Sequence, residues 1–199
     1  MSTTALVVEV LVIGTFALAW VALFAIKLFG LDTATISSWF FQYKDWSTGI
    51  VLIAIAISYQ LGWVVNQLSY FIARKTFNKA IKSKVFKNES KNYDSIKTTV
   101  FMKGSPFMLD KIRERLSVVR LTRSACVNFL LISIGLFALE KWYLGLVALG
   151  VTILLFLQAN DIYTLYCHHI FNAHKVITQD SQNAEKQLKN KKNKSKTTS

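Results

Sequence analysis

The chain has 199 residues, of which 52% are hydrophobic, and it carries a formal net charge of +13 at pH 7. Long uncharged runs alternate with strongly basic blocks, whereas a water-soluble domain places charged residues between its apolar segments throughout. The composition therefore excludes a water-soluble fold and predicts an all-α, polytopic membrane protein.

Four apolar runs are long enough to cross a bilayer, because a helical span needs about 20 mostly apolar residues. The predicted transmembrane helices are about 5–26, 49–73, 120–139 and 143–166. The last two are joined by only three residues and are expected to insert as a hairpin. We expect one four-helix transmembrane domain over 1–176.

The first span contains one carboxylate, Glu9. No basic residue precedes the run 5–26, so we interpret it as a retained span and not as a cleaved signal peptide. An ionisable group in hydrocarbon suggests a function by default. Glu9 lies only about 6 Å inside the boundary, however, and can reach headgroup water or a basic partner such as Arg74. Two roles stay open: packing or orientation, which we place first, and a proton or ion role.

The second span carries polar residues on two faces. Ser58, Gly62, Asn66 and Ser69 fall within one arc at helical spacing, and Gln60 and Gln67 share another face. Such groups form hydrogen bonds between helices in lipid, and in an oligomer they can line a wet path. Contact between helices is the more common role of such polar residues, whereas a polar face that lines a pore is the more specific hypothesis. The candidate pore or helix-interface residues are Glu9, Ser58, Gln60, Asn66 and Gln67.

Positive charge predicts the topology. Residues 74–123 hold fourteen Lys and Arg residues and residues 175–199 hold seven, out of twenty-four in the chain. Short loops rich in Lys and Arg stay on the cytoplasmic side. We therefore expect both termini and the segment 74–123 in the cytoplasm, with the spans in the inner (plasma) membrane.

The segment 74–123 is predicted to be a basic cytoplasmic helical hairpin. An apolar stripe of Phe77, Ile81 and Val85 extends the second helix to about Lys87, and Ser105 followed by Pro106 is a typical helix start. That helix is expected to continue to 139. The predicted basic cytoplasmic surface consists of Arg74, Lys75, Lys79, Lys82, Lys84, Arg113, Arg115, Arg120 and Arg123.

The basic surface has two candidate partners. Anionic lipid attracts each Lys or Arg near the headgroups by about 1 kcal/mol. Charge carried further into the cytoplasm favours an acidic partner, either a protein or a sensor that contains nucleic acid.

Metal and catalytic motifs are absent from the sequence pattern. Cys167, His168, His169 and His174, with Asp161, hold most of the metal-ligand types, but no His pair has the i, i+4 spacing of a helical metal site. No nucleophile or phosphate-binding motif occurs. We expect no enzyme activity, cofactor, metal or small-molecule substrate.

The fourth helix is predicted to end near Val176, and the Lys-rich tail 177–199 is predicted to be disordered.

With four spans and the basic segments 74–123 and 175–199, the chain resembles the small transmembrane effectors of bacterial retron and abortive-infection defence systems. The resemblance implies a membrane protein that a cytoplasmic sensor restrains until infection. The amides of the second span and the uncommitted basic surface then favour a non-enzymatic effector that oligomerises in the inner membrane and impairs its barrier when released. The alternative is an accessory or scaffold subunit that docks an acidic cytoplasmic partner. A transporter is disfavoured because internal repeats and broken spans are missing.

Overall fold

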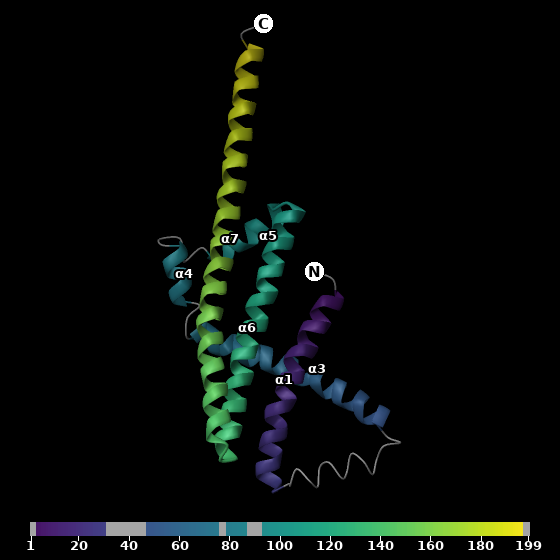
Figure 1. Cartoon of the computed structure of the whole chain (residues 1–199). Coiled ribbons are helices and arrows are strands. Elements are labelled where there is room, and N and C mark those ends of the chain that lie inside the picture. Colours follow the sequence, from purple (N-terminus) through teal and green to yellow (C-terminus); the bar gives the residue numbers. More distant parts are fainter. Residues whose placement is uncertain (1–2, 31–46, 76–78, 87–92, 197–199) are drawn as a thin grey trace. The chain divides into compact units, whose positions relative to one another are not determined.

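The computed structural model describes residues 3–30, 47–75, 79–86 and 93–196. Its regular structure is helical throughout these residues, with no strand among them (Figure 1). The helices are α1 (Thr3–Phe29), α3 (Ser47–Ala73), α4 (Lys79–Phe86), α5 (Tyr93–Lys103), α6 (Pro106–Ala138) and α7 (Trp142–Lys196). The predicted all-α class is confirmed.

The chain forms two compact units. Unit 1 consists of Met1–Phe77 and Ser117–Ile162, and unit 2 consists of Asn78–Leu116 and Tyr163–Ser199. The two long helices α6 and α7 each contribute one part to unit 1 and one part to unit 2. Unit 1 contains most of the apolar sequence, and unit 2 contains most of the basic sequence.

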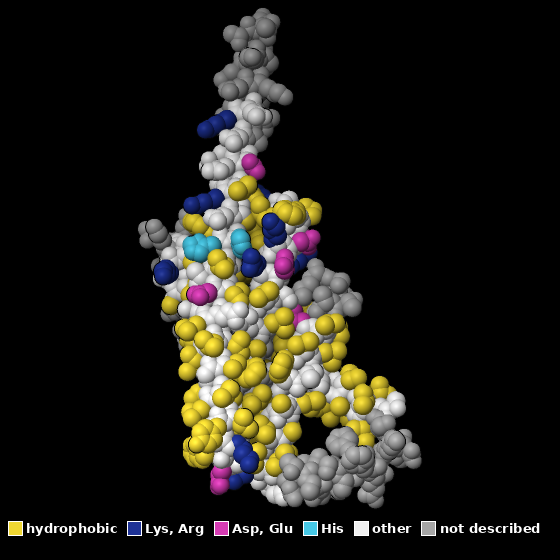
Figure 2. Space-filling model, viewed as in Figure 1, with side chains coloured by type: hydrophobic (Ala, Val, Ile, Leu, Met, Phe, Trp, Pro, Cys, Tyr) yellow, Lys and Arg dark blue, Asp and Glu magenta, His cyan; other side chains and the backbone are white. Residues whose placement is uncertain are grey.

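Four helices are long and apolar enough to cross a membrane: Leu6–Phe29, Thr48–Ala73, Pro106–Ala138 and Trp142–Gln187. Each contains one of the four predicted spans almost entirely, so the four-span architecture expected from the sequence is matched by length and composition. Figure 2 shows hydrophobic side chains over most of the visible face of α6 and α7 in unit 1.

α1 and α3 cross in very close contact (Figure 1). Gly14 of α1 lies against the backbone carbonyl of Ser58, and Gly62 of α3 lies against the backbone carbonyl of Val10. A Cβ atom added at either glycine would overlap the facing carbonyl oxygen. Glycine is therefore required at both positions for the two backbones to approach this closely, as small residues allow in membrane proteins.

The apolar core of unit 1 lies next to this crossing. Ile13 and Ala17 from α1, Val65 from α3 and Val127 from α6 are buried together. Partly buried side chains surround this group, namely Trp20, Leu61, Leu121 and Leu131. Three of the four spans thus contribute to one core.

α6 and α7 are joined by a tight turn at Leu139–Lys141. Lys141 donates its N–H to Leu136 O at 3.0 Å and Glu140 donates its N–H to Phe137 O at 3.0 Å. This is the Schellman pattern of a helix C-terminus. Glu140 has a φ of 61°, in the left-handed region where glycine usually stands. Across the hairpin, Ser133 Oγ donates to Gly145 O at 2.9 Å.

Glu140→Gly is expected to stabilise the hairpin. A residue with a Cβ atom is strained in the left-handed region and glycine is not, so we expect a gain of about 0.5–1 kcal/mol in the free energy of unfolding in mixed micelles. Glu140→Ala keeps the Cβ atom and should bring no gain. Equal stability of the two variants would contradict the role assigned to this turn.

Unit 2 has a core of its own, built by α4, α5, the start of α6 and α7 from Tyr163 onwards. Phe86 of α4 packs edge-on against Tyr93 of α5 and Phe171 of α7, with ring centroids 5.1 and 5.5 Å apart. The Lys82 ammonium lies 3.9 Å from the centroid of the Tyr93 ring. Burial raises the pKa of the Tyr93 phenol well above its ordinary value, with smaller contributions from tyrosines of α7. Tyr93 therefore stays neutral at physiological pH.

The structure refines the predicted hairpin 74–123. The start of α6 at Pro106 agrees with the sequence, and Met108 N donates to Ser105 Oγ at 3.4 Å as a helix cap does. α5 was not expected as a separate helix. The single helix expected over about 49–87 is described as α3 and α4, which belong to different units, and residues 76–78 between them lie outside the described part.

α7 extends beyond Val176, where the fourth helix was predicted to end. α7 runs to Lys196, through most of the range 177–199. This range contains no Gly and no Pro and is rich in Lys, Gln and Asn, so nothing in the sequence breaks a helix that is already formed. Disorder of the isolated tail stays a prediction.

Candidate functional site

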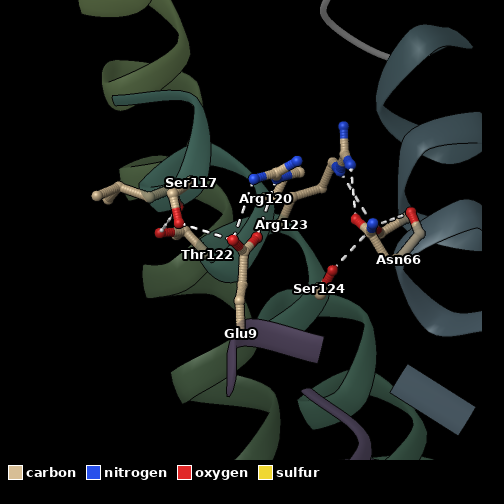
Figure 3. Close-up of polar contacts among 9 residues, drawn as sticks. Glu9, Asn66, Ser117, Arg120, Thr122, Arg123 and Ser124 are labelled. Carbon is tan, nitrogen blue, oxygen red and sulfur yellow. Dashed lines mark hydrogen bonds and ion pairs between the residues drawn. The ribbon is translucent and has the colours of Figure 1, made fainter. Parts of the chain in front are cut away.

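Polar side chains from α1, α3 and α6 meet inside unit 1 (Figure 3). They are one carboxylate, one amide, two guanidinium groups and three hydroxyls. We call them the buried polar cluster: Glu9, Asn66, Ser69, Ser117, Arg120, Arg123 and Ser124. Glu9 is 6% exposed, and Ser69 and Ser124 are fully buried. The other four members are half-buried. Polar groups that are withdrawn from solvent need hydrogen-bond partners.

Glu9 is held by two residues of α6. Arg120 Nε lies 2.9 Å from Glu9 Oε1, and a terminal nitrogen of the same guanidinium donates to Oε2 at 3.1 Å. Ser117 Oγ donates to Oε2 at 2.7 Å. Arg120 thus contacts both carboxylate oxygens, through an ion-pair contact at Oε1 and a charge-assisted hydrogen bond at Oε2. The partner of Glu9 is thus Arg120, and not Arg74, which the sequence suggests.

Arg123 ties α6 to α3. Its Nε donates to Ser69 Oγ at 3.0 Å, and one terminal nitrogen donates to Asn66 Oδ1 at 3.1 Å. Ser69 Oγ donates to the backbone carbonyl of Asn66 at 2.8 Å, so the 3.1 Å bond between Ser69 and Ser124 has Ser124 as its donor. The Arg123 guanidinium also lies 5.4 Å from the centroid of the Tyr70 ring.

Asn128 of α6 makes a second polar tie to α1. Its side chain is fully buried. The amide Nδ2 donates to Ile13 O at 2.9 Å, and Oδ1 accepts from Trp20 Nε1 at 3.1 Å. Asn128 and the serines of α6 were not predicted as site residues. Ser117, Ser124 and Asn128 recur at i, i+7 and i+11, which places them on one face of a helix, and this spacing was the available signal.

The polar arc predicted on the second span faces into unit 1. Ser58 is 4% exposed and lies at the Gly14 crossing, Asn66 accepts from Arg123, and Ser69 is buried. These residues therefore lie at contacts between helices. Gln60 and Gln67 differ, because both side chains are exposed on the other face of α3. Within the described residues neither makes a hydrogen bond.

The predicted basic surface divides into two groups. Arg120 and Arg123 belong to the buried polar cluster, because their positions on α6 face α1 and α3. The exposed members are Arg74, Lys75, Lys84, Arg113 and Arg115, while Lys82 is half-buried over Tyr93. Arg113 forms an exposed ion pair with Asp110 at 3.5 Å. The side chain of Lys79 lies outside the described part.

The cluster suits structural and electrostatic roles. Both oxygens of the Glu9 carboxylate are engaged, which supports its packing role over a proton or ion role. Among the described residues, no three His, Cys, Asp or Glu side chains gather as metal ligands. His168 and His169 are exposed and Cys167 is buried. The expectation that the chain has no metal, cofactor or enzyme activity stays a prediction.

The four long apolar helices are compatible with a multi-pass membrane protein of the all-α class. No protein-family model, no curated protein and no solved structure matches the chain.

Proposed function

We propose that the chain is a multi-pass inner-membrane effector that self-associates through α3 and impairs the membrane barrier when triggered, as in antiviral defence. The exposed amides of Gln60 and Gln67 carry this proposal. They lie seven residues apart, nearly two helical turns, and so share one face of α3. The apolar side chains Val64 and Phe71, 54% and 61% exposed, continue the same face.

Two amides in hydrocarbon require partners. A buried amide without a hydrogen bond costs roughly 2–7 kcal/mol by transfer measurements, and an interhelical bond in lipid recovers part of it. α3 is also the least buried of the four spans, with 17% of its apolar window buried inside the structure. A further helix on this face would satisfy the amides and cover the apolar side chains.

A second copy of the chain fits this face by symmetry. Two copies that insert with the same topology place their α3 helices parallel around a twofold axis. Gln60 then faces Gln60 and Gln67 faces Gln67, and each amide can both donate and accept. In a larger ring the same amides face a central path, which is the polar lining that a membrane defect needs.

Replacing both glutamines with leucine is expected to abolish assembly. The Gln60→Leu/Gln67→Leu variant keeps the volume of the helix face and removes the interhelical hydrogen bonds. We expect loss of oligomers after crosslinking in membranes, and loss of the depolarisation that a membrane-potential dye reports when the unmodified chain is expressed with its trigger.

Gln158→Leu is the matched control, because Gln158 is also an exposed amide but belongs to α7 and not to the Gln60 and Gln67 face of α3. It should assemble and depolarise like the unmodified chain. Asn66 is unsuitable for this test, since its side chain accepts from Arg123 inside unit 1. Full depolarisation by the double variant, with insertion verified, would refute the proposal.

The scaffold function is the second candidate, and unit 2 favours it. Unit 2 has its own core and holds 17 Lys and Arg residues against six Asp and Glu residues, so it carries +11 of the formal net charge. Charge of this size suits an acidic cytoplasmic partner. Purification in mild detergent separates the two functions. A scaffold brings a stoichiometric partner and leaves liposomes tight, whereas an effector self-associates and makes them leak.

A further inference from the structure

An apolar groove of about 260 Å³ lies on unit 2 between the start of α6 and α7. Its apolar lining consists of Phe107, Met108 and Ile112 from α6 and Ala173 and Val176 from α7. Ile112 and Ala173 are buried and form the floor, whereas Phe107 is 69% exposed. A large aromatic side chain thus stays open to solvent at the edge of an apolar depression.

The polar part of the lining is cationic or neutral. Lys111, His169 and Asn172 contribute to the groove, and no carboxylate does. The Lys111 ammonium lies 4.5 Å from the centroid of the Phe107 ring, so it stands directly at the apolar edge. An occupant must therefore offer apolar groups to the floor and negative charge to the edge.

We infer that this groove docks an amphipathic helix of another protein, whose apolar stripe is flanked by Asp or Glu residues. The groove lies between two helices, and amphipathic helices bind in such grooves through apolar anchors one turn apart. Its volume is below the roughly 300–1,000 Å³ of pockets for drug-sized ligands, and it suits the few side chains that one helix face presents.

The charge of unit 2 selects among the occupants. Unit 2 of a second copy is itself strongly cationic, so it offers mostly positive charge to the Lys111 edge of the groove and is a poor occupant of it. A nucleic acid offers negative phosphates but no apolar side chains for Ile112 and Ala173. An acidic amphipathic helix satisfies both the floor and the edge. The inference does not depend on assembly through α3, because it concerns a different unit of the chain.

Site-specific photo-crosslinking tests this inference in the native host. The full-length chain carries p-benzoylphenylalanine in place of Phe107, whose exposure tolerates the change, and crosslinked peptides are identified by mass spectrometry. The matched control places the same group at Met102, which is 80% exposed on α5 outside the groove. We expect a crosslinked segment specific to position 107 that is helical, amphipathic and rich in Asp and Glu.

Charge reversal sharpens the test. Lys111→Glu in the Phe107 probe background should lower the yield of that adduct about tenfold or more, because like charges across an interface cost several kcal/mol. Lys97→Glu, on α5 away from the groove, should leave the yield unchanged. Adducts with phospholipid, with a second copy of the chain or with a segment lacking acidic residues would each overturn the inference. So would a yield at position 107 no higher than at position 102.

Discussion

Gly14→Ala is expected to destabilise the protein severely, although it adds a single methyl group. The new Cβ atom would overlap the backbone carbonyl of Ser58. Backbone atoms of two helices cannot rotate away as a flexible side chain can, so α1 and α3 must separate. Overpacking costs typically about 1–3 kcal/mol, and we expect at least the upper end of this range in the free energy of unfolding in mixed micelles.

Gly150→Ala is the matched control for this substitution. Gly150 is also a helical glycine of a predicted span, but nothing lies within 4 Å of the position that its Cβ atom would take. Alanine favours a helix over glycine by about 1 kcal/mol, so this variant should be neutral or more stable. The same chemical change is thus expected to have opposite signs at the two positions. If Gly14→Ala changed the free energy of unfolding as little as Gly150→Ala, the close approach of the α1 and α3 backbones would be contradicted.

The four long apolar helices could be predicted from the sequence, but their contacts could not. Length and lack of charge identify the four apolar runs. In a run such as 5–26, however, apolar residues cover every face, so periodicity does not show which face meets a neighbour. The crossing of α1 and α3 depends on Gly14 and Gly62, and a single glycine in an apolar run does not reveal its partner in another helix.

The buried polar cluster illustrates the same limit. Glu9 stood out as the only carboxylate of the first span, yet its partner Arg120 is 111 residues away in the chain. Arg120 and Arg123 were predicted to belong to a basic surface, because a count of charges does not distinguish an exposed guanidinium group from one that is hydrogen-bonded inside the protein. α5 was missed although Tyr93, Ile96 and Val100 recur at helical spacing and are buried, because basic and polar residues around them dominate the composition.

The cluster gives the first span a fixed relation to α6. Apolar contact alone distinguishes poorly between rotations of a helix in lipid, since lipid and side chains are similarly apolar. The Glu9–Arg120 pair and the Asn128 bond to Ile13 O lie on the same side of α1 and are satisfied in one rotation only. The ion pair and the hydrogen bonds therefore specify one rotation of α1, whereas the glycines at the crossing only allow the helices to approach closely.

Glu9→Ala is expected to be the second most damaging substitution. It removes the carboxylate that faces Arg120 and Ser117, so the guanidinium loses its counter-charge in an interior where Glu9 is 6% exposed. Removing one member of a buried ion pair costs about 3–5 kcal/mol. We expect a loss of this size in the free energy of unfolding in mixed micelles. Replacing both members by apolar residues, as in Glu9→Leu/Arg120→Leu, should recover most of the loss, because no charge is then left behind.

Asp110→Ala provides the comparison for an ion pair of the same kind at the surface. The side chains of Arg113 and Asp110 are 45% and 70% exposed and lie 3.5 Å apart, and exposed pairs contribute about 0–1 kcal/mol. The loss at Asp110 should therefore be several times smaller than the loss at Glu9. Equal effects at the two positions would mean that water reaches the Glu9 carboxylate. A double variant no more stable than Glu9→Ala would show that Arg120 has a structural role beyond its pairing with Glu9.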